Sequence, residues 1–357
     1  MYPEAVKVFA INPGSTSTKL ALLTVGPEGV RTVHEDVVQH APAPGLTEDL
    51  DRRRGHVHAR AEAWQPFEAV AARGGLVGPV PAGVYEVDPA MVELCLKASH
   101  GAHPANLAAP LALELARRYG VPAYVVDPPT VDELDEVSRV SGAPGIPRRS
   151  RVHALNLRYT ARKVAERLGV AFESAALVGA HLGGGTSVVR FSGGRMVDTN
   201  DALLGEGPFS PNRAGTVPIY GVIEKTARDG RQAARNFFGR EAGFKGLLGT
   251  DDLRQVEARL DDPRVRLTAD AYALQVAKYM LGLAAGQRPQ AFFLTGAGAR
   301  FGYAVRAIEQ RLAWAAPVHV LAGEFEMQAL AEGAWRAASG LETPRRIGEV
   351  IHGSVGL

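Results

Sequence analysis

The chain has 357 residues, which exceeds a typical single domain and predicts two domains. Its 40 basic and 38 acidic residues give a net charge of +2, so no global charge attracts it to nucleic acid or to an anionic membrane. The single cysteine, Cys95, excludes an internal disulfide and fits a reducing compartment. The first residues enter a strand directly and no apolar run approaches about 18 residues. We therefore expect a cytoplasmic protein whose partners are small molecules.

The first motif is a strand, a polar turn and a second strand. Residues 9–23 read FAINPGSTSTKLALL, in which Asn12, Pro13 and Gly14 form a strong turn signal between two apolar runs. The turn offers hydroxyls, a lysine and a glycine that lets backbone amides approach an anion. This pattern predicts a phosphate-binding loop, and an ordinary Ser/Thr-rich hairpin is the alternative for this run taken alone.

The rest of the first half alternates helices and strands, which indicates an α/β fold. Helical stretches at 91–98 and 106–119 precede a strand at 123–126 that ends at Asp127, the edge of a sheet where ligands collect. A turn-capping aspartate before Pro128 is the competing interpretation. Arg73 precedes two glycines, so its guanidinium could reach a small anion, although the bare motif is more often surface structure. Turn formers dominate 141–150, and we place the domain boundary there.

The second half repeats the plan of the first. A helix predicted from residue 153 follows the boundary, and its first residue, His153, is either a site residue or a helix cap. Residues 176–201 then give strand, glycine-rich turn, strand, turn and strand, and laying Asn12 on His181 places Gly14 on Gly183. The chain therefore looks duplicated.

Three further features follow in chain order. Arg213 lies in the loop SPNRAG, which could present a cation or have no specific role. The turn LTGAGARFG at 294–302 joins a strand to a helix, and helix N-termini bind anions. Glu324 and Glu326 follow a predicted strand at 318–321, where they could hold a cation or cap the helix at 326–338. We expect that helix to return to the first domain.

The ordered motifs closely resemble the acetokinase family, and most of all its butyrate kinase branch. The resemblance covers essentially the whole chain and is carried by INPGSTSTK, ARGGL, GAHPANLAAPLA, RRSRVHALN, HLGGGTSV, SPNRAG, LLGTDDLR, LTGAG and AGEFEMQAL. It implies two ribonuclease H-like (actin-like ATPase) domains with a nucleotide cleft between them. Residues 1–150 would form the first domain and 151–325 the second, with 326–357 returning to the first.

The same resemblance implies an activity. We expect reversible, magnesium-dependent phosphoryl transfer from ATP to the carboxylate of butanoate, giving butanoyl phosphate and ADP, in a homo-oligomer. A branched-chain fatty-acid kinase and an acetate or propionate kinase are the alternatives within enzymes. A nucleotide-switched protein of the actin or chaperone kind is the alternative outside them, and it has no need of arginines that bind a carboxylate.

The resemblance also implies roles for individual residues. Arg73 and Arg213 would bind the carboxylate and the transferring phosphoryl group, Asp127 would be the catalytic aspartate, and His153 would stabilise the transition state. The nucleotide would contact Asn12, Ser15, Ser17, Lys19, His181, Gly183, Gly184, Gly185, Asp252, Arg254, Gly296 and Gly298. Asn12 and Glu326 would position magnesium, with Glu324 as the alternative register. Gly75 and Val152 replace bulkier residues of acetate-using relatives, which predicts a deeper acyl pocket.

Overall fold

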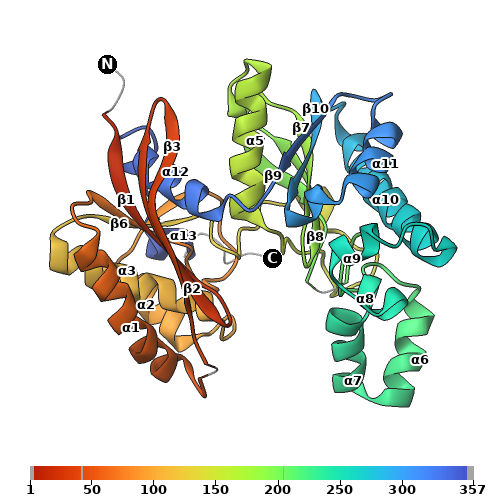
Figure 1. Ribbon diagram of the computed structural model, residues 1–357, viewed down its shortest axis with the longest axis horizontal. Helices are drawn as coiled ribbons and strands as arrows, with labels where there is room; N and C mark the ends of the chain where they lie inside the picture. The colour runs from red at the N-terminus through yellow and green to blue at the C-terminus, as the bar shows by residue number, and fades with distance from the viewer. Residues whose placement is uncertain (1–3, 42, 204, 352–357) are drawn as a thin grey trace. The chain divides into compact units, whose positions relative to one another are not determined.

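The computed structural model describes residues 4–41, 43–203 and 205–351 (Figure 1). It divides into two compact units: unit 1 is Met1–Asp132 with Phe325–Leu357, and unit 2 is Glu133–Glu324. The boundary expected from sequence, 150/151, lies further along the chain. Residues 133–150 belong to unit 2 because they bind one of its strands: the amide of Asp135 donates to Val197 O, and the Arg148 guanidinium donates to Asp198 and to Thr199 O.

Unit 1 is built on a six-stranded sheet with the order β3-β2-β1-β4-β6-β5. The strands are β1 (Val6–Pro13), β2 (Ser17–Gly26), β3 (Gly29–Gln39), β4 (Ala69–Ala72), β5 (Val84–Glu86) and β6 (Ala123–Val126). The first three form an antiparallel meander, whereas β4 is parallel to both β1 and β6. The carboxyl ends of β1, β4 and β6 therefore lie along one edge of the sheet.

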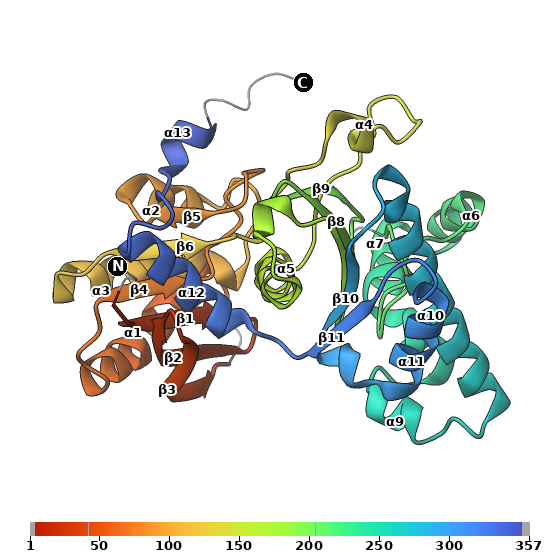
Figure 2. The same cartoon turned by 90° about the horizontal axis from the view of Figure 1, so that it is seen from above.

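Helices cover both faces of this sheet (Figure 2). They are α1 (Leu46–Ala63), α2 (Pro89–Lys97), α3 (Ala108–Tyr119), α12 (Glu326–Ala338) and the short α13 (Ile347–Ile351), with a 3₁₀ turn, η1, at Pro104–Leu107. Because side chains alternate along a strand, Val125 joins the core with α1, α2 and α3, while Val126 contacts Gly333 of α12 on the opposite face. Helix α12 thus belongs to unit 1, although it follows unit 2 along the chain.

Unit 2 repeats this arrangement in a five-stranded sheet with the order β11-β10-β7-β8-β9. Its strands are β7 (Leu177–Leu182), β8 (Thr186–Ser192), β9 (Arg195–Thr199), β10 (Ala291–Gly296) and β11 (Val318–Ala322). As in unit 1, the first three strands, β7, β8 and β9, form an antiparallel meander. Strand β7 also pairs in parallel with β10, the next strand along the chain after the meander. The order matches β6-β4-β1-β2-β3, so the sheet topology shows the duplication suggested by the two glycine hairpins.

The helices of unit 2 include two that pack directly on its sheet. Helix α5 (Ala154–Leu168) packs on β7 and β10, and α10 (Pro263–Leu283) packs on β7 and β8. The others are α4 (Glu136–Arg139), α6 (Ile219–Asp229), α7 (Arg231–Asn236), α8 (Gly243–Leu248), α9 (Leu253–Glu257) and α11 (Gly302–Leu312). In the described part of the chain, no helix is both long enough and apolar enough to cross a membrane.

Candidate active site

Three predicted site residues of unit 1 follow three adjacent parallel strands. Ile11 pairs with Ala72 and Ala72 pairs with Val125, so Asn12, Arg73 and Asp127 all lie at the carboxyl edge of β1, β4 and β6. The Arg73 amide donates to Ile11 O at 3.1 Å, which fixes the start of its loop against β1. This edge is where open α/β sheets bind ligands.

Glu326 joins this edge from the first turn of α12. The Asn12 side-chain amide donates to Glu326 Oε2 at 2.6 Å. Arg73 Nη1 lies 3.3 Å from Asn12 Oδ1 and 3.3 Å from Glu326 Oε1. Of the two glutamates considered from the sequence, the structure brings Glu326 to Asn12. A carboxylate, an amide oxygen and a guanidinium therefore lie together at this edge. The two oxygen groups are suited to a metal cation, and the guanidinium is suited to a phosphate.

Asp127 is held in an uncommon backbone conformation. Its φ of +40° lies in the left-handed region, which costs a non-glycine residue free energy, and its side chain is buried. Gly83 fixes it twice: the Gly83 amide donates to Asp127 Oδ1 at 2.8 Å, and Gly83 O accepts from the Asp127 amide at 3.0 Å. Strained residues of this kind gather at functional sites, which favours a functional role for Asp127.

The first glycine hairpin is a tight turn braced from below. The Gly14 amide donates to Ser17 O at 2.7 Å, Ser15 is exposed, and Lys19 lies opposite Asn12 in the β1–β2 register. Beneath the turn, the fully buried Arg53 guanidinium donates to Ser17 O and to Thr18 Oγ1, at 3.0 and 2.9 Å. The role of Arg53 was not expected from the sequence, because this residue lies far from the turn along the chain.

Gly75 does not leave open space where a side chain would stand. A β-carbon there would lie 2.7 Å from the Asn106 α-carbon, closer than real contacts allow. The buried Asn106 side chain accepts from the Leu76 amide at 2.9 Å and donates to Cys95 O at 2.9 Å. Asn106 thus braces the loop after Arg73. The family resemblance implied an acyl pocket at this position, but Asn106 occupies the space beside the Gly75 α-carbon. The pocket role of Gly75 stays a prediction.

In unit 2, the two predicted histidines stack on each other. The rings of His153 and His181 lie 4.0 Å apart, between centroids, with an angle of 10° between their planes. His181 is in β7 and His153 is the residue before α5. His153 Nδ1 lies 2.8 Å from Ser187 Oγ on β8, and His181 Nδ1 lies 2.8 Å from the amide nitrogen of Asn156. Each ring is therefore oriented by its own buried partner.

The second glycine turn lies between these histidines and Arg213. A β-carbon at Gly183 would lie 2.8 Å from His181 Nε2, and one at Gly185 would lie 2.3 Å from Arg213 Nη1. A side chain at Gly183 would displace the His181 ring, and one at Gly185 would displace the end of the Arg213 side chain. Burial lowers the pKa of Arg213, with Asp201 acting in the opposite direction. The Arg213 guanidinium also donates to Ala202 O at 2.8 Å, so the cation is fixed beside the turn.

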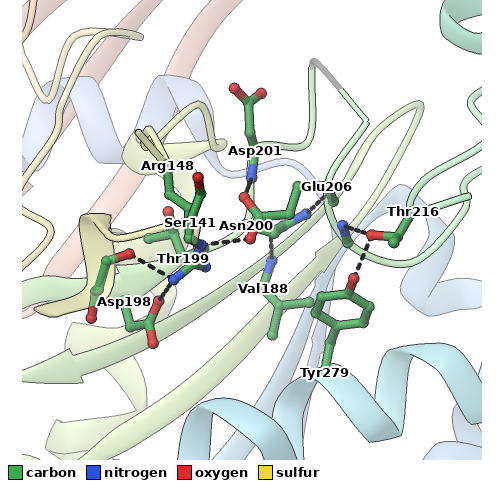
Figure 3. Close-up of polar contacts among 12 residues, drawn as sticks. Ser141, Arg148, Val188, Asp198, Thr199, Asn200, Asp201, Glu206, Thr216 and Tyr279 are labelled. Carbon is green, nitrogen blue, oxygen red and sulfur yellow. Dashed lines mark hydrogen bonds and ion pairs between the residues drawn. The ribbon is translucent and has the colours of Figure 1, made fainter. Parts of the chain in front are cut away.

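A polar network holds the loop that carries Arg213 (Figure 3). Asn200 accepts from the Val188 amide at 2.7 Å and donates to Glu206 O at 2.8 Å. Arg148 donates to Glu206 Oε1 at 2.7 Å and to Asp198 Oδ1 at 3.0 Å. Because Glu206 contacts both Asn200 and Arg148, the start of this loop is tied to β8, β9 and the segment before α5.

The remaining predicted residues lie at the start of α9, at and after the end of β10, and next to His153. Asp252 caps α9 and forms an ion pair at 2.8 Å with the exposed Arg254, whose hydrogen bond lowers the pKa of Asp252 to about 2. Gly296 and Gly298 pack against Leu182 O, where a β-carbon would lie at 2.4 and 2.7 Å. Val152 is buried beside His153. No contact described for these residues tests their assignment to the nucleoside or the acyl group.

Sequence reasoning did not single out Asn106, Asn156 or Ser187, although each belongs to a motif used for the resemblance. All three are buried, and each bonds the backbone or ring of a predicted site residue or its neighbour. The available signal was their position one to four residues from a candidate in the same motif, or, for Asn106, in a motif of its own.

The duplicated sheet order, with a glycine turn after the first strand of each unit, defines the actin-like ATPase fold. A solved propionate kinase from Francisella tularensis has this fold, with a TM-score of 0.72 at 17% identity, covering 93% of this chain and 99% of that one. Residues 141–298 match the acetokinase family. A probable butyrate kinase from Oleidesulfovibrio alaskensis is 40% identical, over 96% of this chain and 98% of that protein, and one from Coprothermobacter proteolyticus is 37% identical, over 94% and 98%. The chain belongs to the acetokinase family, as its motifs predicted.

Proposed function

We propose that the protein is a butyrate kinase that transfers a phosphoryl group reversibly between ATP and butanoate, giving butanoyl phosphate and ADP. The observation that carries this proposal is the convergence of Asn12, Arg73 and Glu326 at the sheet edge of a chain 40% identical to a probable butyrate kinase. ATP is a cytoplasmic metabolite, and we propose that the enzyme acts there.

The chemistry needs charge neutralisation rather than proton removal. A carboxylic acid with a pKa of about 4 to 5 is ionised at neutral pH, so it attacks without a general base. An anionic nucleophile must then meet an anionic γ-phosphate in line. We propose that Arg73 and Arg213 neutralise the two anions, that His153 donates to the phosphoryl oxygens, and that Asp127 orients the reacting groups.

The residues at the Asn12 edge fit a magnesium ion. Mg²⁺ takes oxygen ligands and is usually bound by one or two carboxylates together with substrate phosphates. Glu326 and the amide oxygen of Asn12 supply such oxygens, and Arg73 is the cation that contacts both here. We propose that these two residues hold Mg²⁺, which would neutralise phosphate charge.

The nucleotide is proposed to contact both glycine turns, through Ser15, Ser17 and Lys19 in unit 1 and through His181 and Gly183–Gly185 in unit 2. Asp252, Arg254, Gly296 and Gly298 remain the proposed nucleoside residues, and Glu326 replaces Glu324 as the preferred metal residue. We propose a homo-oligomer and a four-carbon acid, with isobutyrate, propionate and acetate as the competing substrates.

A hydroxamate assay of acyl phosphate formation tests the proposal. The protein is incubated with ATP, Mg²⁺ and each acid from two to six carbons, and we expect the largest kcat/KM with butanoate. Arg73→Ala should remove about 3 to 4 kcal/mol of transition-state stabilisation, so kcat should fall by about two to three orders of magnitude. Arg118→Ala is the matched control, because Arg118 is an exposed arginine that pairs with Glu62 and contacts His58 and the Tyr119 ring. ATP hydrolysis without acid-dependent acyl phosphate would refute the proposal in favour of a nucleotide switch.

A further inference from the structure

Asn156 is a buried amide that bonds a proposed nucleotide-binding histidine. It lies in the first turn of α5 with 1% of its surface exposed. Its side-chain nitrogen lies 2.8 Å from His181 Nδ1, 3.2 Å from Thr295 Oγ1 and 3.5 Å from Gly323 O. The side chain thus spans from β7 to the residue after β11.

The partners of Asn156 determine which ring nitrogen of His181 carries the proton. Gly323 O is a carbonyl and can only accept, so the nitrogen side of the Asn156 amide faces this group of atoms. One amide hydrogen then points to His181, and the other faces both Thr295 Oγ1 and Gly323 O. Because His181 Nδ1 accepts a hydrogen bond, the neutral ring carries its proton on Nε2.

The protonated nitrogen is the one that lies at the second glycine turn. His181 Nε2 lies next to Gly183: a β-carbon built on that glycine would be 2.8 Å from it. An N–H at this position donates to a phosphate oxygen, whereas a lone pair would repel it. The tautomer therefore decides whether His181 attracts or repels the nucleotide phosphates.

We propose that Asn156 is a positioning residue that holds neutral His181 as the Nε2–H tautomer, so that a donor faces the phosphates. This inference rests on the proposed function for its consequence in catalysis, but the tautomer itself is independent of it. Ser187 contacts the corresponding ring nitrogen of the stacked His153. Its side-chain oxygen lies 2.8 Å from His153 Nδ1 and 3.3 Å from the His153 backbone nitrogen.

Nitrogen-15 NMR of the histidine side chains in the full chain tests the tautomer directly. The protein has ten histidines, and the His181 signals are identified by their loss in His181→Gln. We expect an unprotonated Nδ1 and a protonated Nε2 in the wild type. Asn156→Asp replaces the donor by an acceptor of the same shape, so Nδ1 should become protonated. A protonated Nδ1 in the wild type would overturn the proposal even if the variant failed to fold.

Thr160→Val is the matched control. Thr160 donates to Asn156 O at 2.8 Å and contacts Thr295 at 3.2 Å in the same network, but no contact described here joins it to His181. The control should leave the His181 tautomer unchanged. If Thr160→Val shifts it as Asn156→Asp does, or if Asn156→Asp leaves Nδ1 unprotonated, Asn156 has no specific role.

Kinetics then connect the tautomer to the reaction. With butanoate saturating, Asn156→Ala should raise the KM for ATP about tenfold, the order expected for losing one hydrogen bond to a charged group, and raise the KM for butanoate much less. Equal increases in both constants would overturn the positioning role. A confirmed tautomer in a protein that forms no acyl phosphate would instead refute the proposed function and leave the tautomer assignment standing.

Discussion

His40 shows how one side chain beneath the first glycine turn couples stability to pH. Its ring nitrogen Nε2 lies 2.9 Å from Thr18 Oγ1, the same hydroxyl that accepts from Arg53, and only 8% of the residue is exposed. Burial is the largest cause that lowers the pKa of His40 below its ordinary value of 6.5, and the Arg53 charge is the next. The folded protein therefore prefers the neutral ring under the first glycine turn.

The lowered pKa of His40 predicts a loss of stability in mild acid. Below about pH 6.5 the unfolded chain binds a proton that the folded protein accepts less readily, so the free energy of unfolding falls as the pH is lowered from this point through the folded-state pKa. Urea unfolding at pH 7.5 and 5.5 should show a smaller loss in His40→Gln than in the wild type. Part of the loss should remain, because burial and Arg73 also lower the pKa of His103. An equal loss in both proteins would contradict this role of His40.

At the scale of single elements, sequence signals located most helices and failed where a distant residue decides. The predicted helix at 326–338 matches α12, because its apolar spacing is local information. Helix α10 begins at a local signal, since Asp262 accepts from the Arg264 amide at 2.8 Å and Pro263 occupies the first turn. Strand β5 depends on Arg345, which pairs with it through the Arg345 amide and Val84 O at 2.9 Å. No local pattern could reveal that pairing.

Two helical glycines predict opposite effects of the same substitution. A β-carbon at Gly333 in α12 would lie 2.4 Å from Val126 Cγ1, whereas one at Gly55 in α1 would meet nothing within 4 Å. Gly333→Ala should therefore destabilise the protein by about 1 to 3 kcal/mol through overpacking. Gly55→Ala should stabilise it by about 0.5 to 1 kcal/mol, because alanine is the better helix former. Thermal or urea unfolding measures both, and a stabilised Gly333→Ala would show that α12 does not pack this closely on β6.

At the scale of the whole molecule, the duplication explains how the candidate site could be predicted and where prediction stopped. The alignment of Asn12 with His181 matches the structure, because each is the last residue but one of the first strand of its unit. A glycine turn follows each of these strands. Each also meets a residue at the start of a helix, Glu326 for Asn12 and His153 for His181. The supporting shell of Arg53, Asn106 and Asn156 was not predictable, because burial and geometry, rather than residue type, give these polar side chains their roles.

The path of the chain makes unit 1 dependent on its last segment. Strand β11 of unit 2 is followed by α12, which packs on β1, β2, β4 and β6 of unit 1, whereas α5 after β6 packs on β7 and β10 of unit 2. Helix α12 buries Leu330 together with four alanines, Ala329, Ala331, Ala334 and Ala337. Burying one leucine stabilises by about 1.5 to 3 kcal/mol, and whole domains are stable by only about 5 to 15 kcal/mol.

Removing residues 325–357 should therefore unfold or loosen unit 1 selectively. Hydrogen exchange read by mass spectrometry should show lost protection in β1, β2 and β4, because the truncation uncovers the face of the sheet that α12 buries. Strands β7, β8 and β10 serve as the internal control, since α5 and α10 still cover them, and they should keep their protection. Leu330→Ala should act in the same direction with a smaller effect, of about 2 to 5 kcal/mol. Equal loss of protection in both sheets would mean that the stability contributed by α12 is not confined to unit 1.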